Sequence, residues 1–158
     1  MANIEAVAEQ IDGFLNCVRL ISENQREILF GNSGDIITTT QGHILMLLAQ
    51  NGPQTNTQLA GALEVTAAAV TKAVKGLYAE PNVYVTPVAD EQDGRVIRWT
   101  ITASGGTLAS EHARCHRETI EEYQQILADF SADEQQTITK FMTQLETKLR
   151  QENAHGKK

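Results

Sequence analysis

The apolar positions of residues 54–102 change from helical spacing to strand spacing part-way along this stretch. Val70, Val74 and Leu77 recur at helical spacing and are expected to face a core. Thr66 is a suitable N-cap, because its hydroxyl can accept a hydrogen bond from an otherwise unpaired backbone N–H group. The pattern predicts a short helix over residues 57–63, a tight turn at residues 64–65 and a second helix beginning after Thr66.

A β-hairpin is predicted directly after these two helices. Residues 83–88 and 96–102 are rich in β-branched and aromatic side chains, and residues 90–94 between them have turn-forming composition. Arg95 stands at the tip of this hairpin. The order predicts a winged helix-turn-helix, in a mainly α fold with a small β-hairpin wing. The alternative is an α+β fragment that binds no nucleic acid, since any two short helices can resemble a helix-turn-helix.

Long amphipathic helices are predicted on both sides of this region. Residues 3–29 read as one helix, and an apolar seam with a seven-residue repeat favours a partner helix, either in an oligomer or as a lid on the core. The seam consists of Ile4, Val7, Ile11, Phe14, Val18, Ile21, Gln25 and Ile28. Residues 107–129 read as a second long helix, with packing residues Leu108, Cys115, Thr119, Tyr123, Ile126 and Leu127.

Two more helices have recognisable start signals. Residues 38–41 can cap a helix that runs to about residue 50, with Ile44, Leu45, Leu47 and Leu48 buried. Ser131 and Glu134 form a capping box for the last helix. The apolar stripe of that helix contains Ile138, Phe141, Met142, Leu145 and Leu149.

This order of elements predicts the domain organisation. Residues 38–102 form the winged helix-turn-helix, and residues 1–37 and 103–158 form a helical dimerisation region. The terminal helices are expected to pair with those of a second subunit. The two winged units of a homodimer can then bind the two half-sites of a pseudo-palindromic double-stranded DNA operator.

The charge of the chain limits this DNA-binding prediction. The formal net charge is −7, which argues against a protein that coats DNA without specificity. Residues 54–102 hold four basic side chains (Lys72, Lys75, Arg95 and Arg98) against five acidic ones. DNA binding therefore depends on where the basic residues lie. The expected contact residues are Thr66, Ala67, Ala68, Thr71, Lys72, Lys75 and Arg95.

The sequence also indicates where the protein acts. No apolar run approaches the roughly 20 residues of a membrane span, and the first residues do not read as a signal peptide. A cytoplasmic protein without membrane contact is expected. Cys17 and Cys115 are far apart and form no CxxC motif, so both are expected to be reduced thiols.

Three histidines are candidates for metal binding. His112 and His116 are four residues apart on one predicted helix, so both rings project from one face, as in half of a transition-metal site. The alternative is a solvated helix face. Residues 113–115 between them contain no glutamate, so this is not the HExxH motif of zinc proteases. His43 alone reads as a half-exposed packing residue, and composition selects no single carboxylate partner.

The whole pattern resembles the MarR family of dimeric transcription regulators. The resemblance is carried by residues 62–77, by Asp93, Gly94 and Arg95 in the wing, and by residues 99–102 after it. Residues 14–16, 23–29, 41–48 and 111–119 are similar to the zinc-responsive branch of the family, whose members repress zinc-uptake operons.

The resemblance implies a ligand set for zinc. The principal site of that branch falls on Glu27, His43, His112 and His116. A second site in the branch uses a cysteine in the loop after the first helix and two glutamates. One glutamate directly precedes the histidine that corresponds to His43, and the other directly precedes the histidine that corresponds to His112. Here Asn32 or Ser33 replaces the cysteine and Gly42 replaces the first glutamate, which leaves Glu111. A second site is therefore expected to be absent or weak.

The expected function is that of a zinc-dependent DNA-binding repressor of zinc-uptake genes, with Zn(II) as corepressor and no enzymatic activity. Three imidazoles and one carboxylate suit tetrahedral Zn(II) and leave no protein position for catalysis. One alternative is a MarR-type regulator that senses a small aromatic ligand or another metal. The other is a small metallohydrolase, which would need an open coordination position and a nearby general base.

Overall fold

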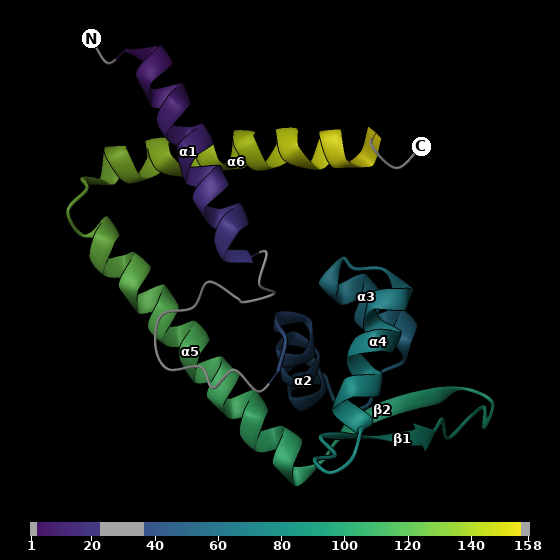
Figure 1. Ribbon diagram of the computed structural model, residues 1–158. Coiled ribbons are helices and arrows are strands. Elements are labelled where there is room, and N and C mark those ends of the chain that lie inside the picture. Colours follow the sequence, from purple (N-terminus) through teal and green to yellow (C-terminus); the bar gives the residue numbers. More distant parts are fainter. Residues whose placement is uncertain (1–2, 23–36, 156–158) are drawn as a thin grey trace. The chain divides into compact units, whose positions relative to one another are not determined.

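The computed structural model describes residues 3–22 and 37–155 (Figure 1). The elements are α1 (Ile4–Ser22), α2 (Thr39–Asn51), α3 (Asn56–Leu63), α4 (Ala67–Tyr78), β1 (Val85–Ala89), β2 (Ile97–Ile101), α5 (Ala103–Leu127) and α6 (Ala132–His155). The chain divides into two compact units, Met1–Glu118 and Thr119–Lys158. The predicted mainly helical fold with one hairpin is confirmed.

Helix α1 confirms the first part of the predicted N-terminal helix. The rest of that prediction, residues 23–29, lies outside the described residues. Within the chain, α1 carries large exposed apolar side chains, which include Ile4, Val7, Phe14, Leu20 and Ile21. A helix with such a face requires a partner to cover it.

Threonine caps define the starts of α2, α3 and α4. Thr38 and Gln41 form the predicted capping box of α2, and Thr66 accepts the Ala69 N–H group at 3.1 Å. Helix α3 begins at Asn56 rather than at residue 57, because Thr55 and Gln58 form a second reciprocal capping box. The same T-x-x-Q pattern that locates α2 also marks this start.

The core of the first unit lies between α2, α3, α4, β1 and the first part of α5. Its buried side chains are Ile44, Leu45, Leu48, Leu59, Val70, Ala73, Val74, Leu77, Val85 and Ala109. The predicted inward face of α4 is confirmed, since Val70, Val74 and Leu77 are at most 2% exposed. Leu47, predicted to be buried, is only half-buried, because it packs at the edge of this core.

The hairpin is antiparallel, with Val85 opposite Ile101 and Ala89 opposite Ile97. It is anchored beyond the two strands, because Gln54 and Trp99 exchange backbone hydrogen bonds of 3.1 and 2.8 Å. The hairpin loop points away from the helices (Figure 1). The strand regions confirm the predicted wing, in the position expected for a winged helix-turn-helix.

Helix α5 begins at Ala103, so the predicted start at residue 107 is wrong. The hydroxyl of Thr102 accepts the Gly105 N–H group at 3.1 Å and donates to the Val83 carbonyl at 2.9 Å. Gly105 is buried against the Tyr84 carbonyl, where a Cβ atom would collide with the backbone. This glycine therefore allows close packing of the first turn of the helix rather than breaking it.

The second unit holds the end of α5 and all of α6. Ser131 and Glu134 form the predicted capping box, and Gln135 Nε2 donates to the carbonyls of Leu127 and Phe130 at 3.0 and 2.9 Å. Tyr123 and Ile126, predicted to pack, are exposed in the single chain. The other large exposed apolar side chains of this unit are Ile120, Phe130, Phe141, Met142 and Leu149.

None of the described helices combines the length and the apolar character required to cross a bilayer.

Candidate metal centre and nucleic-acid interface

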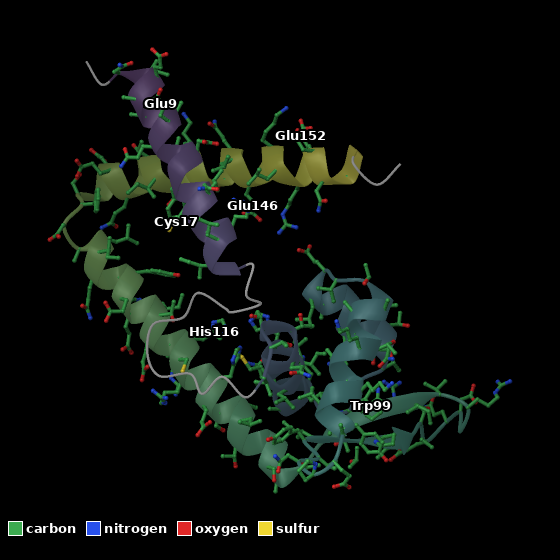
Figure 2. The ribbon with its side chains drawn as sticks, viewed as in Figure 1. Glu9, Cys17, Trp99, His116, Glu146 and Glu152 are labelled. Carbon is green, nitrogen blue, oxygen red and sulfur yellow. The ribbon has the colours of Figure 1, made fainter. Side chains whose placement is uncertain are left out.

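The structure brings His43 of α2 together with His112 and His116 of α5. One ligand atom of each ring lies within 4.8 Å of the others. His43 Nε2 and His116 Nε2 are 3.2 Å apart. Figure 2 shows His116 projecting from α5 on the side that faces α2. Among the described residues, these three are the only group of His, Cys, Asp and Glu side chains clustered tightly enough to hold a metal ion.

The cluster fits a tetrahedral metal ion. Two nitrogens bound tetrahedrally at about 2.05 Å from Zn(II) lie roughly 3.3 Å apart. The His43–His116 distance of 3.2 Å matches this value, and the other pairs of ligand atoms are separated by at most 4.8 Å. All three histidines are half-buried, and Nε2 of His112 is shielded from solvent. Three imidazole nitrogens are donors that zinc, copper and nickel share.

The other predicted ligands are placed differently. Glu27, the proposed carboxylate ligand, lies outside the described residues. Glu111 is exposed and does not belong to the cluster. Cys115 is buried on α5 between the two histidines in sequence, and it is not a member of the cluster either. The described part of the chain therefore presents one candidate centre with three donors.

The first turn of α2 also contacts the second helix of the helix-turn-helix. Gln41 Nε2 donates a hydrogen bond of 3.2 Å to the Ala73 carbonyl of α4. Gln41 is two residues before His43 in the same helix. Sequence reasoning assigned Gln41 only to a cap, and no local signal reveals this contact, because Gln41 and Ala73 are 32 residues apart.

The outer face of α4 is open to solvent, as predicted for a helix that enters a major groove. The exposed residues are Thr66, Ala67, Ala68, Thr71, Lys72 and Lys75. Thr71 Oγ1 donates to the Ala67 carbonyl at 3.0 Å and accepts from Asn56 Nδ2 at 3.5 Å, which leaves its methyl group and one oxygen lone pair for a base edge. Both lysines share this face with small side chains, so a DNA backbone can approach closely.

Arg95 lies at the exposed tip of the hairpin, with 91% of its side chain accessible. Its Nε and Nη2 atoms donate to the two carboxylate oxygens of Asp93, both at 3.0 Å. This pair lowers the pKa of the Asp93 carboxyl and raises the pKa of the Arg95 guanidinium. The arginine is therefore held in one orientation, although an ion pair this exposed adds little stability.

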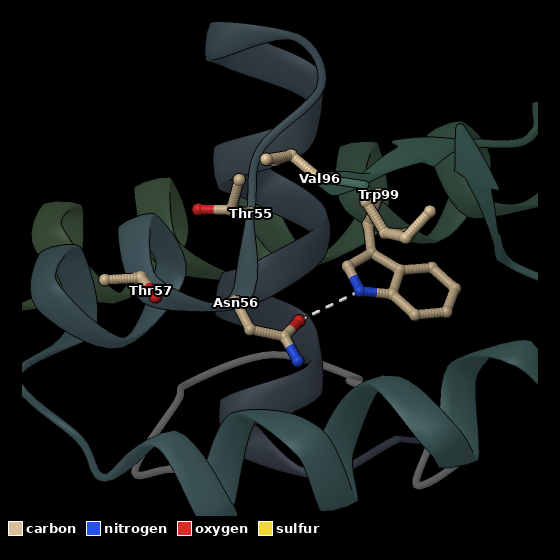
Figure 3. Close-up of a pocket in the computed structure, with 6 residues that line it drawn as sticks. Thr55, Asn56, Thr57, Val96 and Trp99 are labelled. Carbon is tan, nitrogen blue, oxygen red and sulfur yellow. Dashed lines mark hydrogen bonds between the residues drawn. The ribbon is translucent and has the colours of Figure 1, made fainter. Parts of the chain in front are cut away.

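Side chains tie the hairpin to the first turn of α3. Trp99 Nε1 donates to Asn56 Oδ1 at 2.9 Å, and Arg98 Nη1 donates to Gln58 Oε1 at 2.8 Å. Asn56 and Trp99 both line a cavity of about 510 Å³ at the junction of hairpin and helix (Figure 3). Sequence reasoning missed this junction, although the capping pattern at residues 55–58 was available as a signal. The contacts fix the hairpin relative to the helix-turn-helix.

Asp90 completes the hairpin junction. Its carboxylate accepts the Arg98 Nε–H group and the N–H groups of Gln92 and Asp93. The Arg98 hydrogen bond is the main reason that the pKa of Asp90 lies below its ordinary value of 3.8, and the two backbone donors add to it. One carboxylate thus organises the hairpin loop and orients the arginine that contacts α3.

Comparison with known proteins agrees with this arrangement. The sequence profile of the MarR family matches residues 37–97. The transcriptional regulator AdcR of Streptococcus pyogenes is 42% identical over 137 residues, which cover 85% of this chain and 91% of AdcR. The chain belongs to the MarR family. The predicted family and fold class are therefore confirmed.

Solved structures of MarR proteins extend the comparison. ZitR of Lactococcus lactis, described as a zinc-responsive MarR family member, is 35% identical with a TM-score of 0.79. The match covers 90% of this chain and 99% of ZitR. Wild-type ZitR in complex with DNA is 38% identical, with a TM-score of 0.79 over 90% of this chain and 97% of ZitR. Both AdcR and ZitR are described as transcriptional regulators.

Proposed function

We propose that this protein is a zinc-dependent repressor of zinc-uptake genes, which binds a pseudo-palindromic operator as a homodimer with Zn(II) as corepressor. The observation that carries the proposal is the convergence of His43, His112 and His116 from α2 and α5. The likeness to a zinc-responsive member of the family supports it. A repressor of this kind acts in the cytoplasm, where its operator is.

The proposed ligands are these three histidines and Glu27. When bound, the ion supplies coordinate bonds that link α2 to α5. His43 contributes from the helix that also contacts α4, whereas His112 and His116 contribute from the long helix α5. Gln41, in the same turn of α2 as His43, holds the Ala73 carbonyl of α4. Metal binding at the histidines would fix the orientation of α2, and the Gln41 contact would pass this orientation on to α4, the helix that reads DNA. The ion therefore shifts the population of protein molecules towards one orientation of α4.

The proposed contacts with DNA are divided between α4 and the hairpin. Thr66, Ala67, Ala68, Thr71, Lys72 and Lys75 lie on the face of α4 that would enter the major groove. Arg95 at the tip of the hairpin would reach the minor groove or its phosphates. Because the net charge is −7, DNA binding by this chain depends on the positions of these few basic side chains and not on a general positive surface.

Homodimerisation through the terminal regions, residues 1–37 and 103–158, supplies the second half-site contact. The exposed apolar side chains of α1, of the end of α5 and of α6 support this proposal. Such large apolar surfaces are characteristic of protein interfaces. The winged unit of residues 38–102 would then be presented twice, once for each half of the operator.

A DNA-binding experiment tests the proposal directly. An operator is selected from a random duplex library with the zinc-loaded protein, and binding is followed by fluorescence anisotropy before and after zinc is added to chelator-treated protein. Zinc should raise the affinity about 5- to 150-fold, the usual range of such coupling. His112→Ala should remove this dependence and retain the helical circular dichroism of the wild type.

A second readout follows from linkage. If zinc raises operator affinity by a given factor, the operator must raise zinc affinity by the same factor. Equal operator affinity with and without zinc contradicts the corepressor role. Binding of an aromatic ligand that changes operator affinity while zinc does not would support a small-molecule sensor instead.

The identity of the metal requires its own measurement. Cobalt and nickel accept the same imidazole ligands as zinc, and affinity order alone does not exclude them. Metal analysis of freshly purified protein should give zinc at one equivalent per subunit, because Glu111 alone remains of the second site. Two equivalents of zinc, or a stoichiometric amount of another metal, would contradict this part of the proposal.

A further inference from the structure

A chain of hydrogen bonds connects the hairpin to the exposed face of α4 by way of the first residue of α3. Trp99 Nε1 donates to Asn56 Oδ1 at 2.9 Å (Figure 3), and Asn56 Nδ2 donates to Thr71 Oγ1 at 3.5 Å. Thr71 Oγ1 in turn donates to the Ala67 carbonyl at 3.0 Å. The chain thus begins at an indole N–H group of the hairpin and ends at a backbone carbonyl of α4.

Trp99 sets the direction of the bonds made by the Asn56 amide. An indole N–H group can only donate, so the amide oxygen faces Trp99 and the amide nitrogen faces Thr71. The indole is itself held in place, because its ring packs against that of Tyr78 with 5.6 Å between centroids and its backbone pairs with Gln54. The donor that Asn56 directs at Thr71 is therefore fixed before DNA binds.

These bonds assign the hydrogen-bonding capacity of the Thr71 hydroxyl. A threonine hydroxyl has one proton and two oxygen lone pairs. The proton is directed to the Ala67 carbonyl, and one lone pair accepts from Asn56. The second lone pair remains on the exposed face of α4, where the methyl side chains of Ala67 and Ala68 leave room for a base edge. Towards DNA, Thr71 is therefore an acceptor of hydrogen bonds and not a donor.

This polarity selects among the bases. The hydrogen-bond donors in the major groove are the exocyclic amino groups of adenine and cytosine, whereas guanine and thymine present only acceptors there. We propose that Thr71 is a specificity-determining residue, which accepts a hydrogen bond from one adenine or cytosine amino group in each half-site of the operator. The inference rests on the proposed function, because it requires that α4 enters the major groove.

Base analogues without the amino group test the inference. In the selected operator, each adenine is replaced in turn by purine and each cytosine by 2-pyrimidinone, which lack that group. Binding of the full chain is measured by competition anisotropy at saturating zinc. One such replacement in each half-site should lower the affinity of the wild type about 2- to 10-fold, the usual effect of one hydrogen bond.

Variants of Thr71 identify the residue that makes this contact. Thr71→Val retains the size of the side chain but lacks the hydroxyl, so the same base replacement should cost no further affinity. Thr71→Ser keeps the hydroxyl and should lose affinity on that replacement as the wild type does. Thr139→Val is the matched control, because Thr139 Oγ1 makes the equivalent bond of 3.0 Å to the Gln135 carbonyl in α6, outside the proposed DNA-reading face. It should behave as the wild type.

Two results would overturn the inference. The first is an equal response of the wild type and Thr71→Val to every amino-group replacement, which would show that Thr71 accepts from none of these groups. The second is a difference between the two proteins that appears only with 7-deazaguanine or 7-deazaadenine, which lack the N7 acceptor, because the hydroxyl would then donate to DNA. If the wild type selects no operator at all, the proposed function itself fails, which is a distinguishable result.

Discussion

Gln41 joins the turn that carries His43 to the carbonyl of Ala73 in α4. The same amide side chain has a second role, because its Oε1 atom accepts the Thr38 N–H group at 2.9 Å and completes the cap of α2. One residue therefore fixes the start of α2 and links it to the helix with the proposed DNA-reading face. The Gln41 side chain is therefore a hydrogen-bonded connection between the turn that carries His43 and α4.

Gln41→Glu separates these two roles. Glutamate retains the acceptor for Thr38 and preserves the capping box, but it cannot donate to the Ala73 carbonyl. The zinc-dependent gain in operator affinity should fall by about 0.5–2 kcal/mol, the usual effect of a residue that modulates coupling. Zinc affinity without DNA should change little. Operator titrations at zero and saturating zinc measure the difference, and an unchanged gain would exclude Gln41 from the connection.

Arg95→Ala should weaken operator binding by removal of a phosphate contact. Each neutralised phosphate contributes about 0.9 to the slope of log affinity against log salt. The slope should therefore decrease by about one for each subunit, with similar effects on operator and unrelated DNA. Anisotropy titrations at several salt concentrations provide the slope. Arg150→Ala, which removes the same charge from the exposed surface of α6, is the control; equal slopes for both variants would argue against a wing contact.

Asp90 predicts a pH dependence of the hairpin. A carboxyl whose pKa is lowered in the folded state stabilises that state above its ordinary pKa, here 3.8, and this contribution is lost as pH falls through the folded value. The hairpin should therefore loosen only below pH 3.8. A carbon-13 titration of the Asp90 carboxyl should show the lowered pKa. Arg98→Gln should return it towards 3.8, because Arg98 provides the principal hydrogen bond. An unchanged pKa in that variant contradicts the assignment.

Asn56→Ala should destabilise the junction between hairpin and α3. It leaves the Trp99 indole N–H group without its acceptor, which costs about 1 kcal/mol. Trp99 is the single tryptophan of the chain, so its fluorescence reports urea unfolding and the local change together. Asn56→Asp keeps the acceptor and adds a favourable negative charge in the first turn of α3. Both variants lose the 3.5 Å hydrogen bond from Asn56 Nδ2 to Thr71, so they differ in the acceptor for Trp99. Asn56→Asp should therefore be more stable than Asn56→Ala, and equal losses in both variants would contradict the role of the Trp99 hydrogen bond.

The amino-acid sequence determined the features that depend on near neighbours. The threonine and serine caps at Thr38, Thr66 and Ser131 are each decided by residues three positions away. The buried and exposed faces of α4 follow from helical periodicity in the same way. The sequence also predicted which histidines to consider, since the spacing of His112 and His116 places both on one face of α5.

Tertiary structure decided the features that depend on distant parts of the chain. His43 meets His116 across 73 residues, and no local pattern encodes that contact. The predicted start of α5 at residue 107 is wrong, because Gly105 packs against the Tyr84 carbonyl in the first turn of the helix and the local sequence does not encode that contact. The close approach of Gly42 to the His112 ring is likewise visible only once α5 lies against α2. Local hydrogen bonding and periodicity determine the elements, but the distance between two side chains is determined by how the elements pack.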